Sequence, residues 1–266
     1  MLRRIVFCTL LLAGCAGGGD ERPVSTEREV PVREGNVLVI VLDTVRDDRV
    51  GKPGVTPNLD AFAARATVFE NARSNSGWTL PAHASLFTGV YPVQHRATQE
   101  TLAFGIDLPT IAERFSDAGW DTFGASTNGV VSEANGLARG FARFEETFRS
   151  DVASRFGRGV HPNEGTLVDF LDKNDERPWF AFLNYIEAHL PYRPPAAFVA
   201  KHVDTARFSP QQIAMAQRVK MRDHYLSPEG LPDELFELLG QLYDAEVAAL
   251  DASCLLYTSD AADEDC

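Results

Sequence analysis

The sequence has 266 residues, with 25 lysines and arginines against 38 aspartates and glutamates, a formal net charge of −13. This acidic balance, with no basic cluster, argues against a nucleic-acid partner. The four cysteines are Cys8, Cys15, Cys254 and Cys266, so a disulfide scaffold, a thiolate metal site and a cysteine nucleophile are excluded between them.

The N-terminus carries an export pattern. Arg3 and Arg4 precede the apolar run Ile5 to Leu12, which is typical of a secretory signal and too short for a transmembrane helix. The Leu-Ala-Gly-Cys sequence ending at Cys15 resembles a bacterial lipobox, which implies a signal peptide over residues 1–15 and a lipid on Cys15. We expect an exported bacterial lipoprotein of the cell envelope, facing the periplasm or the cell surface and anchored to the membrane.

Three further segments follow the signal. Residues 16–35 are rich in glycine and then in charge, and they predict a flexible tether. Residues 36–253 form the predicted domain. Residues 254–266, CLLYTSDAADEDC, resemble the translation of a sequencing adapter, so we interpret them as an artefactual tail and expect the C-terminal part of the domain to be missing.

The domain begins with a strand pattern. Val37 to Leu42 is a continuous aliphatic run, which indicates a central strand of a parallel sheet. Asp43 follows it, at the strand end where open α/β sheets bind their ligands. A strand-end aspartate can equally be a turn or cap residue. We expect Asp47 and Asp48 to be solvated turn carboxylates.

Strands and helices alternate along the rest of the domain. The patterns predict helices over residues 56–65, 108–118, 208–225 and 232–252, an extended segment over 67–70, and strands over 120–125 and 178–186. This alternation predicts an α/β fold, a three-layer α/β/α sandwich around a mostly parallel sheet.

Residues 78–89, WTLPAHASLFTG, place a hydroxyl group before a helix. Thr79 precedes Pro81, which suits a first helical turn, and Gly89 ends the apolar helix over residues 82–87. The free N–H groups and the dipole of such a helix start attract an anionic ester. The alternative is that Thr79 only caps a buried helix.

The same stretch resembles the sulfatase signature, which reads Cys or Ser, any residue, Pro, Ser, Arg, a small residue, Ser, two apolar residues, Thr and Gly. Thr79 stands at the Cys position and His83 at the Arg position. Residues 36–51, NVLVIVLDTVRDDRVG, resemble the first motif of that family, in which the first Asp after the strand binds the metal. The resemblance implies an alkaline-phosphatase-like fold and a divalent ion (zinc, manganese or calcium) held by Asp43 and Thr79.

Two later elements extend the resemblance. His189 begins a His-Leu-Pro-Tyr sequence similar to the family's His-x-Pro-Tyr element, whose His contacts the ester group. The Lys and His that many sulfatases carry after the strand over 120–125 are absent; Asn128 is the nearest polar residue, and its Asn-Gly pair favours a turn. YDAEVAALD, over residues 243–251, resembles the helix that precedes the second half of the family's domain, and no Asp-His-Gly follows it. We therefore expect this chain to be inactive as written.

The residue at the nucleophile position changes the expected chemistry. Sulfatases use a formylglycine made by oxidising Cys or Ser, whereas oxidation of the secondary alcohol of Thr79 gives a ketone. A metal-activated threonine alkoxide can instead attack phosphorus in line. We expect a hydrolase or transferase of phospho- or phosphonate esters, with His83 or His189 stabilising the ester oxygens. The alternatives are a sulfuric ester hydrolase and a non-catalytic surface lipoprotein that binds a ligand. The sequence does not indicate the oligomeric state.

Overall fold

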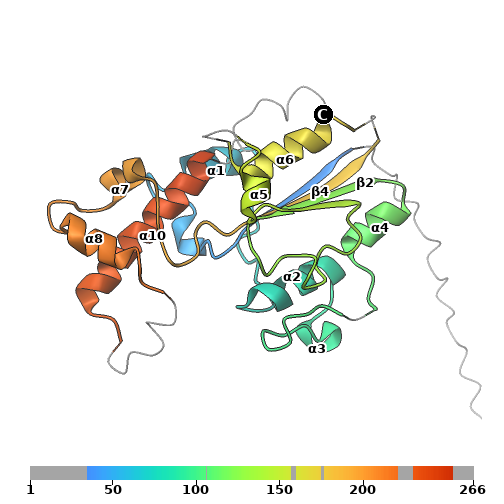
Figure 1. The fold of residues 1–266 in the computed structure, drawn as a ribbon, viewed down its shortest axis with the longest axis horizontal. Coiled ribbons are helices and arrows are strands. Elements are labelled where there is room, and N and C mark those ends of the chain that lie inside the picture. The colour runs from blue at the N-terminus through green and yellow to red at the C-terminus, as the bar shows by residue number, and fades with distance from the viewer. Residues whose placement is uncertain (1–34, 106, 157–159, 175–176, 221–229, 254–266) are drawn as a thin grey trace, which may run out of the picture. The chain divides into compact units, whose positions relative to one another are not determined.

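The computed structural model describes residues 35–105, 107–156, 160–174, 177–220 and 230–253 (Figure 1). The predicted signal with Cys15, most of the tether and the predicted tail lie outside these residues. In the described part, no helix has both the length and the apolar character needed to cross a membrane.

Four parallel strands form one sheet in the order β1-β4-β2-β3. They are β1 (Val37–Leu42), β2 (Asp121–Ser126), β3 (Arg143–Glu146) and β4 (Trp179–Tyr185). The predicted α/β class with a parallel sheet is confirmed. Strand β3 was not predicted, because its sequence, RFEE, has no apolar run. Since all strands run the same way, their carboxyl ends meet at one edge of the sheet.

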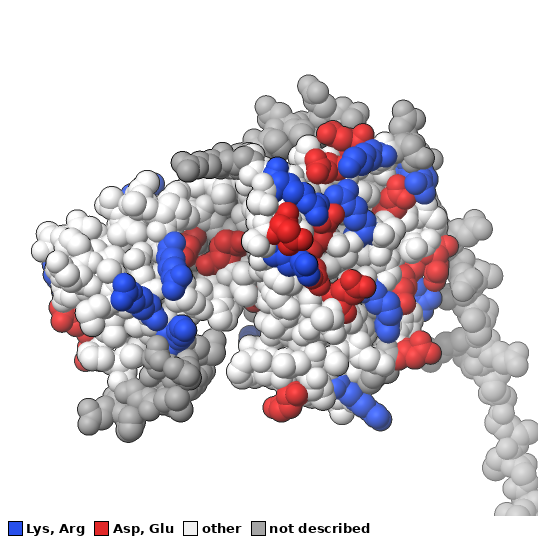
Figure 2. All heavy atoms as spheres, viewed as in Figure 1, with Lys and Arg blue, Asp and Glu red and all other residues white. Residues whose placement is uncertain are grey.

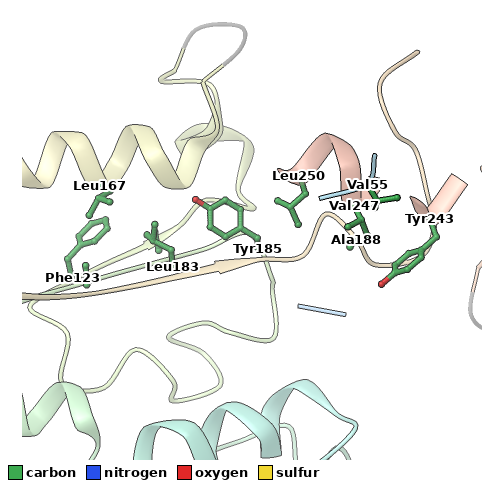
Figure 3. Close-up of a cluster of buried hydrophobic side chains, with 11 residues drawn as sticks. Val55, Phe123, Leu167, Leu183, Tyr185, Ala188, Tyr243, Val247 and Leu250 are labelled. Atoms are coloured by element: carbon green, nitrogen blue, oxygen red, sulfur yellow. The ribbon is translucent and has the colours of Figure 1, made fainter. Parts of the chain in front are cut away.

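The two faces of the sheet are covered by different helices (Figure 1). Val39 and Phe182 belong to the cluster that includes residues of α2 (Thr79–Thr88) and α4 (Ile111–Asp117). Leu183 belongs to a second cluster with Leu167 and Leu250 (Figure 3), contributed by α6 (Pro162–Leu171) and α10 (Asp233–Ser253). Because side chains alternate along a strand, this arrangement gives the expected α/β/α layers.

Most predicted helices are present, with shifted ends. Helix α1 (Pro57–Ala63) and α10 are confirmed, whereas α8 (Pro210–Ala216) is shorter than predicted within the described residues. The segment over residues 67–70, which was expected to be extended, forms no strand, and Phe69 is 78% exposed. Within the described residues, the structure contains five helices that the sequence did not predict: η1 (Asp47–Arg49), α3 (Pro92–His95), α5 (Ser150–Ala153), α6 (Pro162–Leu171) and α7 (Ala196–His202).

Basic and acidic side chains are interspersed on the face seen in Figure 2. Many are paired locally, as Arg143 is with Glu145 at 2.9 Å and Arg207 is with Glu237 at 2.5 Å.

Candidate functional site

Asp43 lies at the carboxyl edge of the sheet, where it is held by the residue that follows β2. Asn128 Nδ2 donates a hydrogen bond to Asp43 Oδ2 at 2.7 Å, and Asn128 is 2% exposed. Asn128 Oδ1 accepts from the backbone N–H of Val130 at 2.9 Å. Asn128 therefore closes the predicted turn and also orients the Asp43 carboxylate, a contact that the sequence did not reveal.

Thr79 is the first residue of α2 and not its cap. Trp78 occupies the cap position with extended backbone angles and no side-chain cap hydrogen bond. The helix ends at Gly89, whose φ of 71° lies in the left-handed region that glycine adopts without strain. Thr79 is half-buried, and the cap role considered for its side chain does not describe this helix.

His83 lies one turn after Thr79 and uses both ring nitrogens inside the protein. Nδ1 donates to the backbone oxygen of Thr79 at 2.8 Å, and Asn184 Nδ2 donates to Nε2 at 3.1 Å. Because a carbonyl oxygen only accepts, the proton of the neutral ring sits on Nδ1. Burial lowers the pKa of His83, against opposing effects of the Thr79 carbonyl and Asp43, so the ring is neutral near pH 7.

A buried chain of hydrogen bonds connects Asp43 with the nucleophile candidate. Ser126 Oγ accepts from the backbone N–H of Asn128 at 3.0 Å and donates to Asn184 Oδ1 at 3.2 Å. Ser126 and Asn184 are both fully buried. The chain therefore runs without a break through Asp43, Asn128, Ser126, Asn184, His83 and the backbone oxygen of Thr79.

Sequence reasoning missed Ser126 and Asn184 because they lie inside strands. The available signal was a single polar residue near the carboxyl end of each apolar run. Asn184 shares its strand face with Phe180 and Phe182, the face covered by α2, which is why it meets His83.

His189 and Glu187 follow β4 at the same edge. His189 Nδ1 donates to the backbone oxygen of Leu190 at 2.7 Å, so the neutral ring presents Nε2 as its acceptor. Glu187 accepts from His161 Nε2 at 2.9 Å and from Thr127 Oγ1 at 3.4 Å. His161, which the sequence analysis did not single out, thus orients a carboxylate near the candidate site.

The oxygens of Asp43 and Thr79 are hard donors of the kind that divalent ions bind. Asp43 is half-buried, and a carboxylate that accepts one bond from Asn128 retains acceptor capacity. No group of three or more His, Cys, Asp or Glu residues suited to a metal ion occurs in the described part of the chain. Asp43 and Thr79 therefore fit part of a metal coordination shell.

Glu246 is a second carboxylate close to this edge. It is 8% exposed, accepts a hydrogen bond from the backbone N–H of Arg193, and borders a cavity of about 430 Å³ with Glu187. Burial raises the pKa of Glu246 to about 7, helped by the charge of Glu187 and opposed by the Arg193 bond. Folding therefore favours the protonated carboxyl group.

This pKa predicts a stability that declines with rising pH. The stabilisation of the folded state that comes from the raised pKa of Glu246 is fully present below the ordinary pKa of 4.5. It is lost as the pH rises through about 7. We expect Glu246→Gln, which cannot ionise, to be more stable than the wild type by about 2 kcal/mol at about pH 8, and the difference to shrink toward about pH 5. Urea unfolding at both pH values measures it. The exposed Glu234→Gln is the control, and a pH-independent difference for Glu246→Gln would contradict the expectation.

Comparisons with known proteins place the chain in a family. The Sulfatase family model matches residues 35–260. The uncharacterized sulfatase YidJ of Escherichia coli is 25% identical over 209 residues, which are 65% of this chain and 42% of YidJ. Among solved structures, the phosphonate monoester hydrolase of Agrobacterium radiobacter is similar with a TM-score of 0.66 at 19% identity, over 86% of this chain and 60% of that one.

The zinc complex of the periplasmic domain of EptC from Escherichia coli is also similar, with a TM-score of 0.53 at 15% identity, over 86% of this chain and 60% of that one. These structural likenesses confirm the alkaline-phosphatase-like fold. The chain thus spans about two fifths of the length of YidJ and three fifths of these structures. With the family model matched over most of its length, the chain belongs to the sulfatase family.

Proposed function

We propose that the protein is a metal-dependent hydrolase or transferase of phospho- or phosphonate esters, with Thr79 as its nucleophile. The observation that carries the proposal is the buried chain of hydrogen bonds that ties the Asp43 carboxylate to the first turn of α2. Such a chain fixes the Asp43 carboxylate and the backbone of the helix turn that carries Thr79, and preorganisation of a catalytic site requires such fixed elements.

The identity of residue 79 favours phosphorus over sulfur chemistry. A threonine side chain cannot be oxidised to the formylglycine aldehyde, but its hydroxyl is a competent nucleophile once deprotonated. The similar phosphonate monoester hydrolase acts, by its name, on phosphonate esters. The similar EptC structure contains zinc, which supports a divalent ion here, although its identity is open to experiment.

In the proposed reaction Thr79 Oγ1 forms a bond to phosphorus as the bond to the ester oxygen breaks on the opposite side, and the proton lost from the Thr79 hydroxyl balances the one that the leaving oxygen takes up. Asp43 and Thr79 would hold a divalent ion, which would supply charge neutralisation and a lower pKa for the hydroxyl. The His83 bond to the Thr79 carbonyl fixes the first turn of α2, and thereby the origin of the attacking side chain. His189 is the remaining candidate to contact an ester oxygen, and because its Nδ1 donates to the Leu190 carbonyl, its Nε2 can donate to that oxygen only in the protonated ring.

The substrate class is tested on the complete gene product, assayed with manganese on an aryl phosphonate monoester, an aryl phosphodiester and an aryl sulfate. We expect kcat/KM for one of the phosphorus esters to exceed that for the sulfate by about a hundredfold or more. Chelation and Asp43→Asn should abolish the activity. Faster hydrolysis of the aryl sulfate would contradict the proposal.

Sulfuric ester hydrolysis is the second candidate, because the family model and YidJ carry the sulfatase name. The threonine at the nucleophile position argues against it. We further propose, on the pattern of residues 1–15 alone, that the protein is exported and lipidated on Cys15.

A further inference from the structure

The turn that carries Asp43 has an unfavourable backbone conformation. Thr44, immediately after Asp43, has a φ of 62°, in the left-handed region. For a β-branched residue this conformation is a clear outlier and is unfavourable. The surrounding structure must therefore hold the turn in place.

Tyr243 of α10 contacts this turn from nearly 200 residues away in the sequence. Its hydroxyl donates to the backbone oxygen of Thr44 at 2.8 Å and accepts from the backbone N–H of Arg46 at 2.8 Å. One hydroxyl thus bonds the carbonyl of the left-handed residue Thr44 and the amide two residues later, on either side of Val45. The Tyr243 ring is 5% exposed and packs against Tyr192 at a centroid distance of 5.3 Å, which fixes its direction.

Two aspartates of the same helix hold the chain that follows the turn. Asp244 pairs with Arg49 at 2.6 Å and with Lys52 at 2.5 Å. Asp251 is 3% exposed and accepts from the backbone N–H groups of Asn58 at 2.9 Å and Leu59 at 2.8 Å. It therefore caps α1, for which Thr56 provides no side-chain cap bond.

We propose that Tyr243 is a positioning residue, whose hydroxyl holds the strained Asp43–Arg46 turn so that the Asp43 carboxylate meets Asn128 and a divalent ion. The metal-binding part rests on the proposed function. Burial raises the pKa of Tyr243, so the hydroxyl keeps the proton that it donates to Thr44. The Tyr-Asp-Ala-Glu-Val sequence of α10 then has a function beyond packing, since its first residue reaches the site through the backbone of another element.

The test is NMR of this chain, comparing the wild type with Tyr243→Phe, which keeps the ring and removes only the hydroxyl. We expect hydrogen exchange of the Arg46 amide to accelerate about tenfold or more, because its acceptor is gone. The Asn128 side-chain amide, which donates to Asp43, should shift toward the position of an unbonded amide. Asp251→Ala is the matched control: it removes another contact of α10 with the same connection, and it should alter Asn58 and Leu59 but leave Arg46 and Asn128 unchanged.

Wild-type signals for Arg46 and Asn128 in Tyr243→Phe would overturn the proposal, as would equal changes in Asp251→Ala. Titration with Mn²⁺ tests the proposed function separately. Broadening of the Asn128 signal that is lost in Asp43→Asn supports Asp43 as a metal ligand, whereas no broadening, or broadening that persists in the variant, counts against it. The interpretation of the hydrogen-exchange data does not depend on the result of the Mn²⁺ titration.

Discussion

Truncation of Asn184 to alanine is expected to lower the free energy of unfolding by about 2–4 kcal/mol. The Asn184 side chain is fully buried, donates to His83 Nε2 and accepts from Ser126 Oγ. Its removal leaves the buried Nε2 of His83 without its donor, takes one acceptor from the Ser126 hydroxyl, which keeps its bonds with the backbone of Asn128, and opens a small cavity. Chemical denaturation measures the loss, with the exposed Asn71→Ala as control.

Asn184→Asp sharpens this test because it keeps the shape of the side chain and replaces the amide donor with a buried carboxylate. The introduced carboxylate can accept from Ser126, but it cannot donate to His83 Nε2. A protonated His83 would restore that hydrogen bond, so the deficit of Asn184→Asp should shrink as the pH falls below the ordinary histidine pKa of 6.5. A deficit of less than about 0.5 kcal/mol for Asn184→Ala would show that the network contributes nothing to stability.

Much of the fold could be predicted because the central strands have continuous apolar sequences. Val37–Leu42 and Trp179–Tyr185 are long, aliphatic or aromatic segments that only a buried parallel strand accommodates. Strand β3 and the short helices escaped prediction because tertiary pairing, and not local pattern, stabilises them. The segment at residues 67–70, which was expected to be extended, pairs with no strand in the described part of the chain.

The site was predictable only in part. Asp43 and Thr79 could be named because strand ends and helix starts are visible in the sequence. The connection between Asp43 and Thr79 could not be predicted, because it runs through Asn184 and Ser126. These two residues lie on different strands, and the register between the strands decides that they meet. The geometry also places His83 within the network, with both nitrogens bonded, and not in the open position that its place in the motif suggested.

Thr79→Ala should lower turnover of the preferred phosphorus ester in the complete gene product by about a thousandfold or more, since no other hydroxyl replaces the attacking group. Thr79→Ser keeps a hydroxyl and should retain measurable turnover. Thr88→Ala is the matched control, because Thr88 lies on the same helix and bonds only the backbone of Ala84 and Val90. Steady-state kinetics at saturating manganese distinguishes the three variants.

Mapping the covalent intermediate tests the central claim most directly. The complete gene product is quenched in acid during turnover of a phosphorus ester, digested, and examined by mass spectrometry. Our account predicts a phosphoryl or phosphonyl group on the peptide that contains Thr79, and its disappearance in Thr79→Ala. An adduct on another residue, or one that persists in Thr79→Ala, would contradict the assignment of Thr79 as the nucleophile.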